Sequence, residues 1–235
     1  MKLDYEITTY LNQFAQHSWV FDKFFVFISS NQLLKGGVLL TLIWWAWFKS
    51  EDCHDHNREQ IVSTLLSCMI ALVLAKILEH TLPLRLRPMD EESIHFLFPL
   101  GITATPLKGV NSFPSDHAVL FFSLSTGLFL ISRWSGVFAL CYTIVIVIFP
   151  RLYLGLHYMT DIIAGAIIGA TITLLGNIYL VRNKNIQMLA NWSRTKPSHF
   201  YPLFFLLTYQ FAELFDSSRA LAHTALRFMR RIVAS

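Results

Sequence analysis

Charged side chains are scarce in this sequence, and this scarcity excludes several classes of protein. Only 14% of the 235 residues are Asp, Glu, Lys or Arg, against about 25% in an ordinary soluble domain. Hydrophobic residues make up 54%, and 20 Phe, 8 Tyr and 6 Trp are among them. The composition excludes a disordered chain, argues against a water-soluble enzyme, and favours one membrane domain rich in aromatic residues.

Two further absences concern partners and cross-links. The net charge is only +4, and no stripe of Lys and Arg could follow a nucleic-acid backbone, so we expect no nucleic-acid partner. The cysteines Cys53, Cys68 and Cys141 are an odd number at unrelated spacings. This pattern predicts reduced residues and no disulfide framework.

Apolar runs fill most of the chain. A spanning helix needs about 20 mainly apolar residues. Five segments come close to this length and are given below. A sixth candidate, 200–215, is interrupted by Pro202, Gln210 and Glu213. We expect that sixth segment to be re-entrant or interfacial, although spanning stays open. The fold class predicted is all-α, a polytopic membrane bundle of five to six transmembrane helices. The five clearer segments are 34–48, 61–82, 118–132, 137–156 and 162–181.

The two ends of the chain differ from this apolar centre. Residues 5–29 place polar and aromatic residues at helical spacing, which favours an amphipathic helix lying in the membrane interface. The tail 218–235 is similar, with a basic end. We therefore expect a single domain over 1–235, with an amphipathic region at 1–33, a catalytic core at 60–181 and the uncertain segment at 199–217.

Charged residues beside membrane segments are costly, so each is a candidate functional residue. The predicted topology brings three groups of them to one membrane face, because segments two and four end there and segments three and five begin there. Arg85 is interpreted as an anchor that reaches toward the interface. The groups are Lys76, His80, Arg85 and Arg87; Ser115, Asp116 and His117; and Arg151, His157 and Asp161.

This set of side chains suits a phosphate ester. Arginine forks bind phosphoryl oxygens in bidentate fashion. The first turn of a helix beginning near Ser115 offers free N–H groups and the positive end of the helix dipole. Asp161, at i+4 from His157, could fix the imidazole tautomer and stabilise its cation. His117 could protonate the leaving oxygen.

Two weaker patterns are interpreted conservatively. Residues 53–56, Cys-His-Asp-His, lack the distant partner pair of a metal site, so no metal is predicted there. Gly165 and Gly169 form a small-residue motif. Such a motif serves helix packing within one chain more often than dimerisation, and the oligomeric state stays open.

The sequence resembles the membrane-bound type-2 phosphatidic acid phosphatase superfamily, whose signature is Lys-x6-Arg-Pro, then Pro-Ser-Gly-His, then Ser-Arg-x5-His-x3-Asp. Residues 60–181 carry this resemblance. His80 stands at the position of the first lysine, and Lys76 one turn earlier could supply the ammonium. The matching stretches are Arg87-Pro88, residues 114–117 (Pro-Ser-Asp-His), and Arg151 with His157 and Asp161 at the signature spacing.

The resemblance implies a helical bundle and a metal-independent phosphohistidine mechanism without a cofactor. It implies that His157 attacks phosphorus, that Asp161 orients His157, and that His117 protonates the leaving group and then activates water. Asp116 replaces the signature glycine, as in the bacterial undecaprenyl-pyrophosphate phosphatases. The residues expected to bind substrate are Arg87, Arg151, Ser115, Asp116, Lys76 and His80.

Several functions remain open at this stage. The resemblance implies a lipid phosphatase that removes the terminal phosphate of polyprenyl pyrophosphate, in a bacterial inner membrane with its site facing the periplasm. Pro150, Arg151 and Gly155 are also similar to the lipid A phosphotransferases, which would pass that phosphate to another lipid. A phosphatidic acid or phosphatidylglycerophosphate phosphatase is a further alternative, and an inactive lipid-binding or transport protein is the least favoured.

The first prediction concerns metal ions. Arg87, Arg151 and a helix N-terminus supply the positive charge that the transition state needs, so no divalent ion is required for that role. We expect phosphate release from the lipid substrate to be unchanged in excess EDTA. Full loss of activity on chelation, restored by Mg²⁺, would indicate a metal-assisted site instead.

Overall fold

The computed structural model describes residues 2–49, 54–102, 111–216 and 218, and every regular element in them is helical. Ten α-helices are joined by short π- and 3-10-helical turns. The α-helices are α1 (Lys2–Asn12), α2 (Trp19–Ser30), α3 (Val38–Phe48), α4 (His54–Thr81), α5 (Asp116–Ile131), α6 (Arg133–Tyr142), α7 (Phe149–Tyr153), α8 (Met159–Tyr179), α9 (Lys184–Thr195) and α10 (Pro197–Ala212). The turns are η1 (Leu33–Gly37), η2 (Pro88–Asp90), η3 (Glu92–Ile94) and η4 (Thr143–Ile148).

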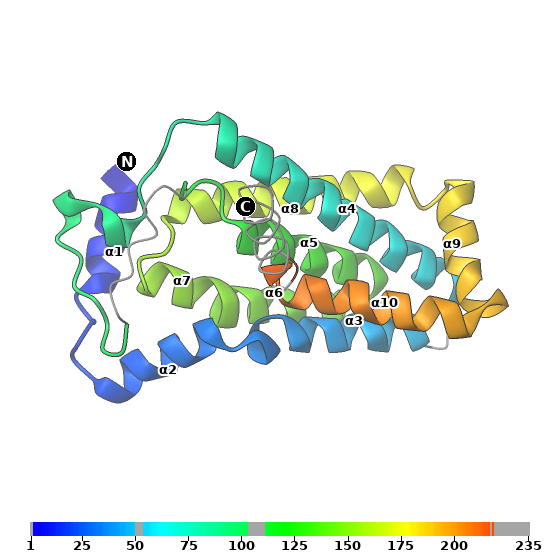
Figure 1. Cartoon of the computed structure of the whole chain (residues 1–235), viewed down its shortest axis with the longest axis horizontal. Coiled ribbons are helices and arrows are strands. Elements are labelled where there is room, and N and C mark those ends of the chain that lie inside the picture. Colours follow the sequence, from blue (N-terminus) through cyan, green and yellow to red (C-terminus); the bar gives the residue numbers. More distant parts are fainter. Residues whose placement is uncertain (1, 50–53, 103–110, 217, 219–235) are drawn as a thin grey trace, which may run out of the picture.

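The longer helices run along one axis and form a bundle (Figure 1). Helices α4, α5 and α8 pack against one another at its centre, and α6 follows α5 as a hairpin partner. α1 lies at one end of the bundle, and α9 crosses the other end (Figure 1). α10 runs beside α3 and ends near the middle of the long axis (Figure 1). The bundle therefore has two unlike ends, and the polar motifs all lie toward the end with α1.

Three helical stretches are long and apolar enough to cross a membrane: His56–Thr81, Arg133–Tyr153 and Met159–Tyr179. Trp19–Ser30 and Leu33–Phe48 pass the same test as a pair, bent by 67° at their junction, which raises the number to four. α5 is apolar but has only 16 residues, fewer than the about 20 that a span requires. The membrane helical bundle is thus present, with three to four spans of sufficient length in the described part of the chain.

The N-terminal region differs from the single interfacial helix expected over residues 5–29. The structure divides it into α1 and α2, and Gln16 between them adopts a positive φ of 65°. Ser18 caps α2 through its hydroxyl, which accepts the N–H of Phe21. The sequence gives no sign of this turn, because the helical spacing of polar and aromatic residues continues across residues 13–18 and none of these residues is Gly or Pro.

Cys68 and Cys141 are free thiols. Cys68 is buried, as expected for a core cysteine, whereas Cys141 is exposed. Cys53 lies outside the described residues, as does the predicted basic tail apart from Ser218.

The Gly165/Gly169 motif packs helices within the chain, as predicted. A Cβ atom on Gly169 would lie 2.2 Å from the carbonyl oxygen of Val119, and one on Gly165 would lie 2.8 Å from both the Ala118 Cβ and the Ser115 carbonyl oxygen. These glycines let α8 approach the first turns of α5 closely. That approach brings the start of α8 next to the start of α5, where two of the three motifs lie.

The second prediction tests this close approach. Gly169→Ala would force α8 away from a backbone oxygen that cannot move independently, so we expect it to lower the free energy of unfolding by about 1–3 kcal/mol. Thermal unfolding of the full chain in detergent measures the change. Gly37→Ala is the matched control, because its Cβ would meet only the flexible side chain of Leu33. Equal melting temperatures for the two variants would contradict the packing described.

Candidate active site

The three predicted groups meet at one end of the bundle. The N–H of Ser115, before α5, donates to the carbonyl oxygen of Asp161 in α8 at 3.2 Å. Lys76 of α4 forms an ion pair of 2.5 Å with Asp116 of α5. The loop after Arg87 is tied to the turn before His157, since the N–H of Met89 donates to the Gly155 carbonyl at 3.0 Å. The convergence expected from topology is therefore realised in the structure.

His157 is buried and held by a backbone oxygen. Its Nδ1 lies 2.9 Å from the carbonyl oxygen of Ser112. A carbonyl can only accept, so Nδ1 carries the proton and Nε2 keeps its lone pair. Burial lowers the pKa of His157 below its ordinary value, the charges of Arg87 and Arg151 act in the same direction, and Asp161 opposes them. The ring is therefore neutral at neutral pH, with Nε2 available as a nucleophile.

The relation between His157 and Asp161 differs from the expected one. α8 begins at Met159, so His157 precedes the helix and the two residues do not share a helix face. Asp161 Oδ2 lies 3.8 Å from His157 Nδ1, and the Ser112 carbonyl takes the closer position. Gly155 makes this turn possible with a φ of +66°, a conformation that favours glycine.

Asp161 is fully buried and accepts three hydrogen bonds. Arg85 Nη1 reaches its Oδ1 at 2.6 Å. The hydroxyl of Ser112 donates to its Oδ2 at 2.7 Å, and the N–H of Tyr158 donates to the same oxygen at 2.8 Å. A buried carboxylate needs this degree of pairing to stay ionised. Asp161 therefore fixes the Arg85 loop, the segment before α5 and the start of α8 relative to one another.

Arg85 is a partner of this carboxylate, whereas the sequence suggested a membrane anchor. Its Nη2 also pairs with Asp4 Oδ2 at 2.7 Å, and its guanidinium lies 4.2 Å from the centroid of the Tyr158 ring. Asp4 in turn accepts from the N–H and hydroxyl of Thr160, at 3.0 and 2.8 Å. Burial raises the pKa of Asp4, but the hydrogen bonds from Thr160 and Arg85 outweigh it and hold the pKa below its usual value.

Two other arginines act on His157. Arg151 is 3% exposed and donates from Nη1 to the carbonyl oxygen of Val147 at 3.0 Å. The Nε of Arg87 is buried and has no hydrogen-bond partner within the described residues. Burial lowers the pKa of Arg87, and nearby carboxylates including Asp90 oppose this effect. Two guanidinium groups with donors left over are suited to bind an anion in front of His157.

The start of α5 supplies the second histidine. The Ser115 hydroxyl is buried and accepts the N–H of Ala118 at 3.5 Å, so it caps the helix. The ring of His117 stacks on Phe121 with a centroid separation of 6.2 Å. Because the Ser115 N–H also donates to the Asp161 carbonyl oxygen, this end of α5 lies beside the motif residues of α8, as its sequence position predicted.

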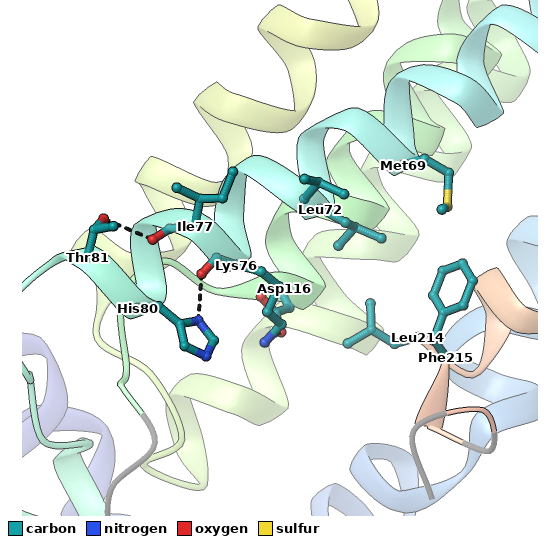
Figure 2. Close-up of a pocket in the computed structure, with 10 residues that line it drawn as sticks. Met69, Leu72, Lys76, Ile77, His80, Thr81, Asp116, Leu214 and Phe215 are labelled. Atoms are coloured by element: carbon teal, nitrogen blue, oxygen red, sulfur yellow. Dashed lines mark hydrogen bonds and ion pairs between the residues drawn. The ribbon is translucent and has the colours of Figure 1, made fainter. Parts of the chain in front are cut away.

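Lys76 and His80 share one groove, as their i, i+4 spacing predicted. Lys76 pairs with Glu79 as well as with Asp116, both at 2.5 Å. His80 Nδ1 lies 2.7 Å from the carbonyl oxygen of Lys76. Lys76, His80 and Asp116 line a cavity of about 570 Å³, and Figure 2 shows them on the side away from Met69 and Phe215. The rest of its wall is apolar and includes Met69, Leu72, Ile77, Leu214 and Phe215.

Sequence reasoning did not identify Asp4 or Ser112, and it misassigned Arg85. Ser112 lies three residues before the Ser115 motif; its contact with His157 is made by a backbone oxygen, which leaves no residue-type signal, and only its hydroxyl bond to Asp161 depends on the side chain. Asp4 reaches the site from the first helix, more than 150 residues away in the chain from Thr160. In the described residues, no three His, Cys, Asp or Glu side chains are grouped as a metal site would require.

Comparison with known proteins places residues 60–185 within the pattern of the PAP2 superfamily. The chain is 42% identical over 59 residues to the bacitracin transport permease protein BcrC of Bacillus licheniformis, 25% of this chain and 29% of that protein. It is 22% identical to the undecaprenyl-diphosphatase BcrC of Bacillus subtilis, over 74% of this chain and 82% of that protein. It is 28% identical to an undecaprenyl-diphosphatase of Sulfolobus acidocaldarius, over 51% and 54%. No solved structure matches the chain significantly.

The third prediction concerns Arg85. Arg85→Met would leave the buried Asp161 and Asp4 carboxylates without their shared cation, and breaking a buried pair in this way costs about 3–5 kcal/mol. We expect a large drop in the melting temperature in detergent. Arg133→Met removes the same charge from an exposed position and is the control.

A second variant separates positioning from stability. Asp4→Asn keeps Arg85 and its bond to Asp161, so we expect a smaller loss of stability and a phosphatase rate closer to that of the natural chain. If Arg85→Met unfolds no more readily than Arg133→Met, the network does not hold the site together.

Proposed function

This chain belongs to the PAP2 superfamily and is a phosphatase, and from that premise we propose that it removes the terminal phosphate of undecaprenyl diphosphate or a similar polyprenyl diphosphate. The observation that carries the proposal is the neutral, buried His157, with Nδ1 bound to a backbone oxygen and two arginine charges beside it. The names of the Bacillus subtilis and Sulfolobus acidocaldarius relatives support the substrate class.

The first chemical step forms a covalent intermediate. The Nε2 lone pair of His157 attacks the terminal phosphorus, a P–N bond forms, and the P–O bond to the lipid phosphate breaks. His117 donates a proton to the departing oxygen, so lipid monophosphate leaves in a stable form. The phosphorylated ring keeps its Nδ1 proton and becomes cationic. The Ser112 carbonyl at 2.9 Å and the Asp161 carboxylate at 3.8 Å stabilise that cation.

The second step releases phosphate. Neutral imidazole at His117 accepts a proton from water, the water oxygen attacks phosphorus, and the P–N bond breaks. His157 recovers its lone pair, and inorganic phosphate departs. Arg87, Arg151 and the N–H groups at the start of α5 bind the phosphoryl oxygens through both steps, where the added negative charge of the transition state strengthens each contact. Ser115 contributes by capping that helix and keeping its N–H groups directed at the anion.

The lipid chain occupies the groove of Figure 2. Its apolar wall accepts an isoprenoid chain, and its polar end holds Lys76, His80 and Asp116 near the start of α5. Lys76 and His80 are placed beside the phosphate that stays on the lipid. Asp116 keeps the Lys76 ammonium directed toward α5 through their ion pair.

The end of the bundle that carries the site faces outward from a bacterial inner membrane. Support comes from the opposite end, where α9 crosses the bundle (Figure 1). That end collects Arg182, Lys184, Arg194 and Lys196, and basic residues favour the cytoplasmic side. In this arrangement α5, although shorter than a typical span, leads from the site toward the cytoplasmic side, and α10 enters the bundle from the cytoplasmic end.

The fourth prediction tests the assigned catalytic residues. We expect His157→Ala and His117→Ala to lower phosphate release from undecaprenyl diphosphate by about 1,000-fold or more while the protein stays folded. When catalytic groups act together, removing one of them removes most of the rate. His199→Ala, on the first turn of α10 at the far end, is the matched control and should retain full activity.

The same assay with lipid A added separates hydrolysis from transfer. A phosphatase releases the same inorganic phosphate with and without the acceptor, whereas a phosphotransferase labels lipid A. Substantial phosphate release by His157→Ala would contradict the proposed mechanism.

A further inference from the structure

A buried lysine outside the family motifs lies close to Arg151. Lys35 is in the π-helical turn η1, within the apolar run that continues into α3, and it is only 6% exposed. Its ammonium makes no hydrogen bond or ion pair with any described residue. A buried charge without a partner is costly, so this lysine is expensive to keep for packing alone.

The backbone around Lys35 is held firmly. The hydroxyl of Tyr142 donates to the carbonyl oxygen of Leu34 at 2.6 Å. On the other side, a Cβ atom on Gly36 would lie 2.4 Å from the backbone of Ala212 at the end of α10. η1 also contacts η4, the turn that leads into Arg151. The turn therefore has a fixed position between α10 and the segment that carries Arg151. π-Helical turns are frequent at functional sites.

Lys35 and Arg151 form a pair of buried cations without an ion-pair partner in the described part of the chain. Arg151 donates only to a backbone carbonyl, and its positive charge acts on Lys35. The Asp216 carboxylate, which accepts from Gln32 at 3.3 Å, is the acidic group whose charge acts on both cations. Two neighbouring cations with so little compensation favour a dianionic or trianionic ligand.

We propose that Lys35 is a further substrate-binding residue, which contacts the diphosphate group beside Arg151. The inference rests on the proposed function and extends it, because Lys35 lies outside residues 60–185 that match the family. A bound diphosphate would neutralise the positive charges of Lys35 and Arg151. The carboxylate of Asp216, four residues after α10, offsets part of the positive charge of Lys35 and Arg151.

The test compares Lys35→Met, Lys35→Arg and the control Lys184→Met in the full chain in detergent. Calorimetric titration with inorganic pyrophosphate measures anion binding directly. We expect Lys35→Met to weaken the Kd about tenfold or more, as for loss of a charged hydrogen bond, and Lys35→Arg to stay within about threefold. Lys184 is exposed at the far end, so Lys184→Met should bind as the natural chain does.

Thermal unfolding separates binding from a structural role. Removing an uncompensated buried charge should leave the melting temperature of Lys35→Met equal or higher. A lower melting temperature with an unchanged Kd would overturn the proposal, as would a natural chain that does not bind pyrophosphate.

Hydrolysis of undecaprenyl diphosphate is followed in parallel. We expect Lys35→Met to raise KM about tenfold with kcat within about threefold. If the natural chain releases no phosphate from this lipid, the proposed function fails, whereas the pyrophosphate titration still decides the role of Lys35.

Discussion

The site depends on the hydrogen bonds and the ion pair that the buried carboxylate of Asp161 accepts. It accepts from Arg85, from the Ser112 hydroxyl and from the Tyr158 N–H, three groups that come from separate segments. Through Arg85 it is also joined to Asp4 in the first helix. Because the carboxylate is fully buried, losing a donor would leave its negative charge less well compensated. The three segments are therefore stabilised in contact with one another. The position of the Ser112 carbonyl, and so of the His157 ring, follows from this arrangement.

The charges of the site are divided by role. Arg85 pairs with the buried carboxylates, whereas Arg87 and Arg151 have N–H donors that could bind an anion. The charges of Arg87 and Arg151, together with burial, lower the pKa of His157. A cationic imidazole has no lone pair for attack, so the arginines proposed to bind phosphate would also keep the proposed nucleophile neutral. The proposed role of Lys35 would add a further positive charge beside Arg151. The proposed diphosphate would add negative charge beside Arg87 and Arg151, whose guanidinium groups form no ion pair within the described residues.

Much of this site could be predicted from the sequence, because segment order alone brings the ends of α4, α5 and α8 together. Periodicity also placed Lys76 and His80 in one groove. Prediction from the sequence failed where a residue acts through a contact distant in the chain: Asp4 pairs with Arg85, 81 positions away. It failed again at His157, because α8 begins two residues later and the i, i+4 rule holds only inside a helix. The segment predicted at 118–132 matches α5 closely, but Ser115 and Ser132 limit that helix to 16 residues, fewer than the about 20 that a span requires.

The most direct test of the central claim is to trap the intermediate on His157. The full chain in detergent would be mixed with undecaprenyl diphosphate labelled in its terminal phosphate, quenched in base after milliseconds, and mapped by mass spectrometry of its peptides. His117→Ala lacks both the acid of the first step and the base of the water step, so the labelled intermediate should form more slowly and persist once formed. The account predicts a base-stable, acid-labile phosphoryl group on His157 in the natural chain and in His117→Ala. Turnover of the lipid with no label on His157, or with label on another residue, would contradict it.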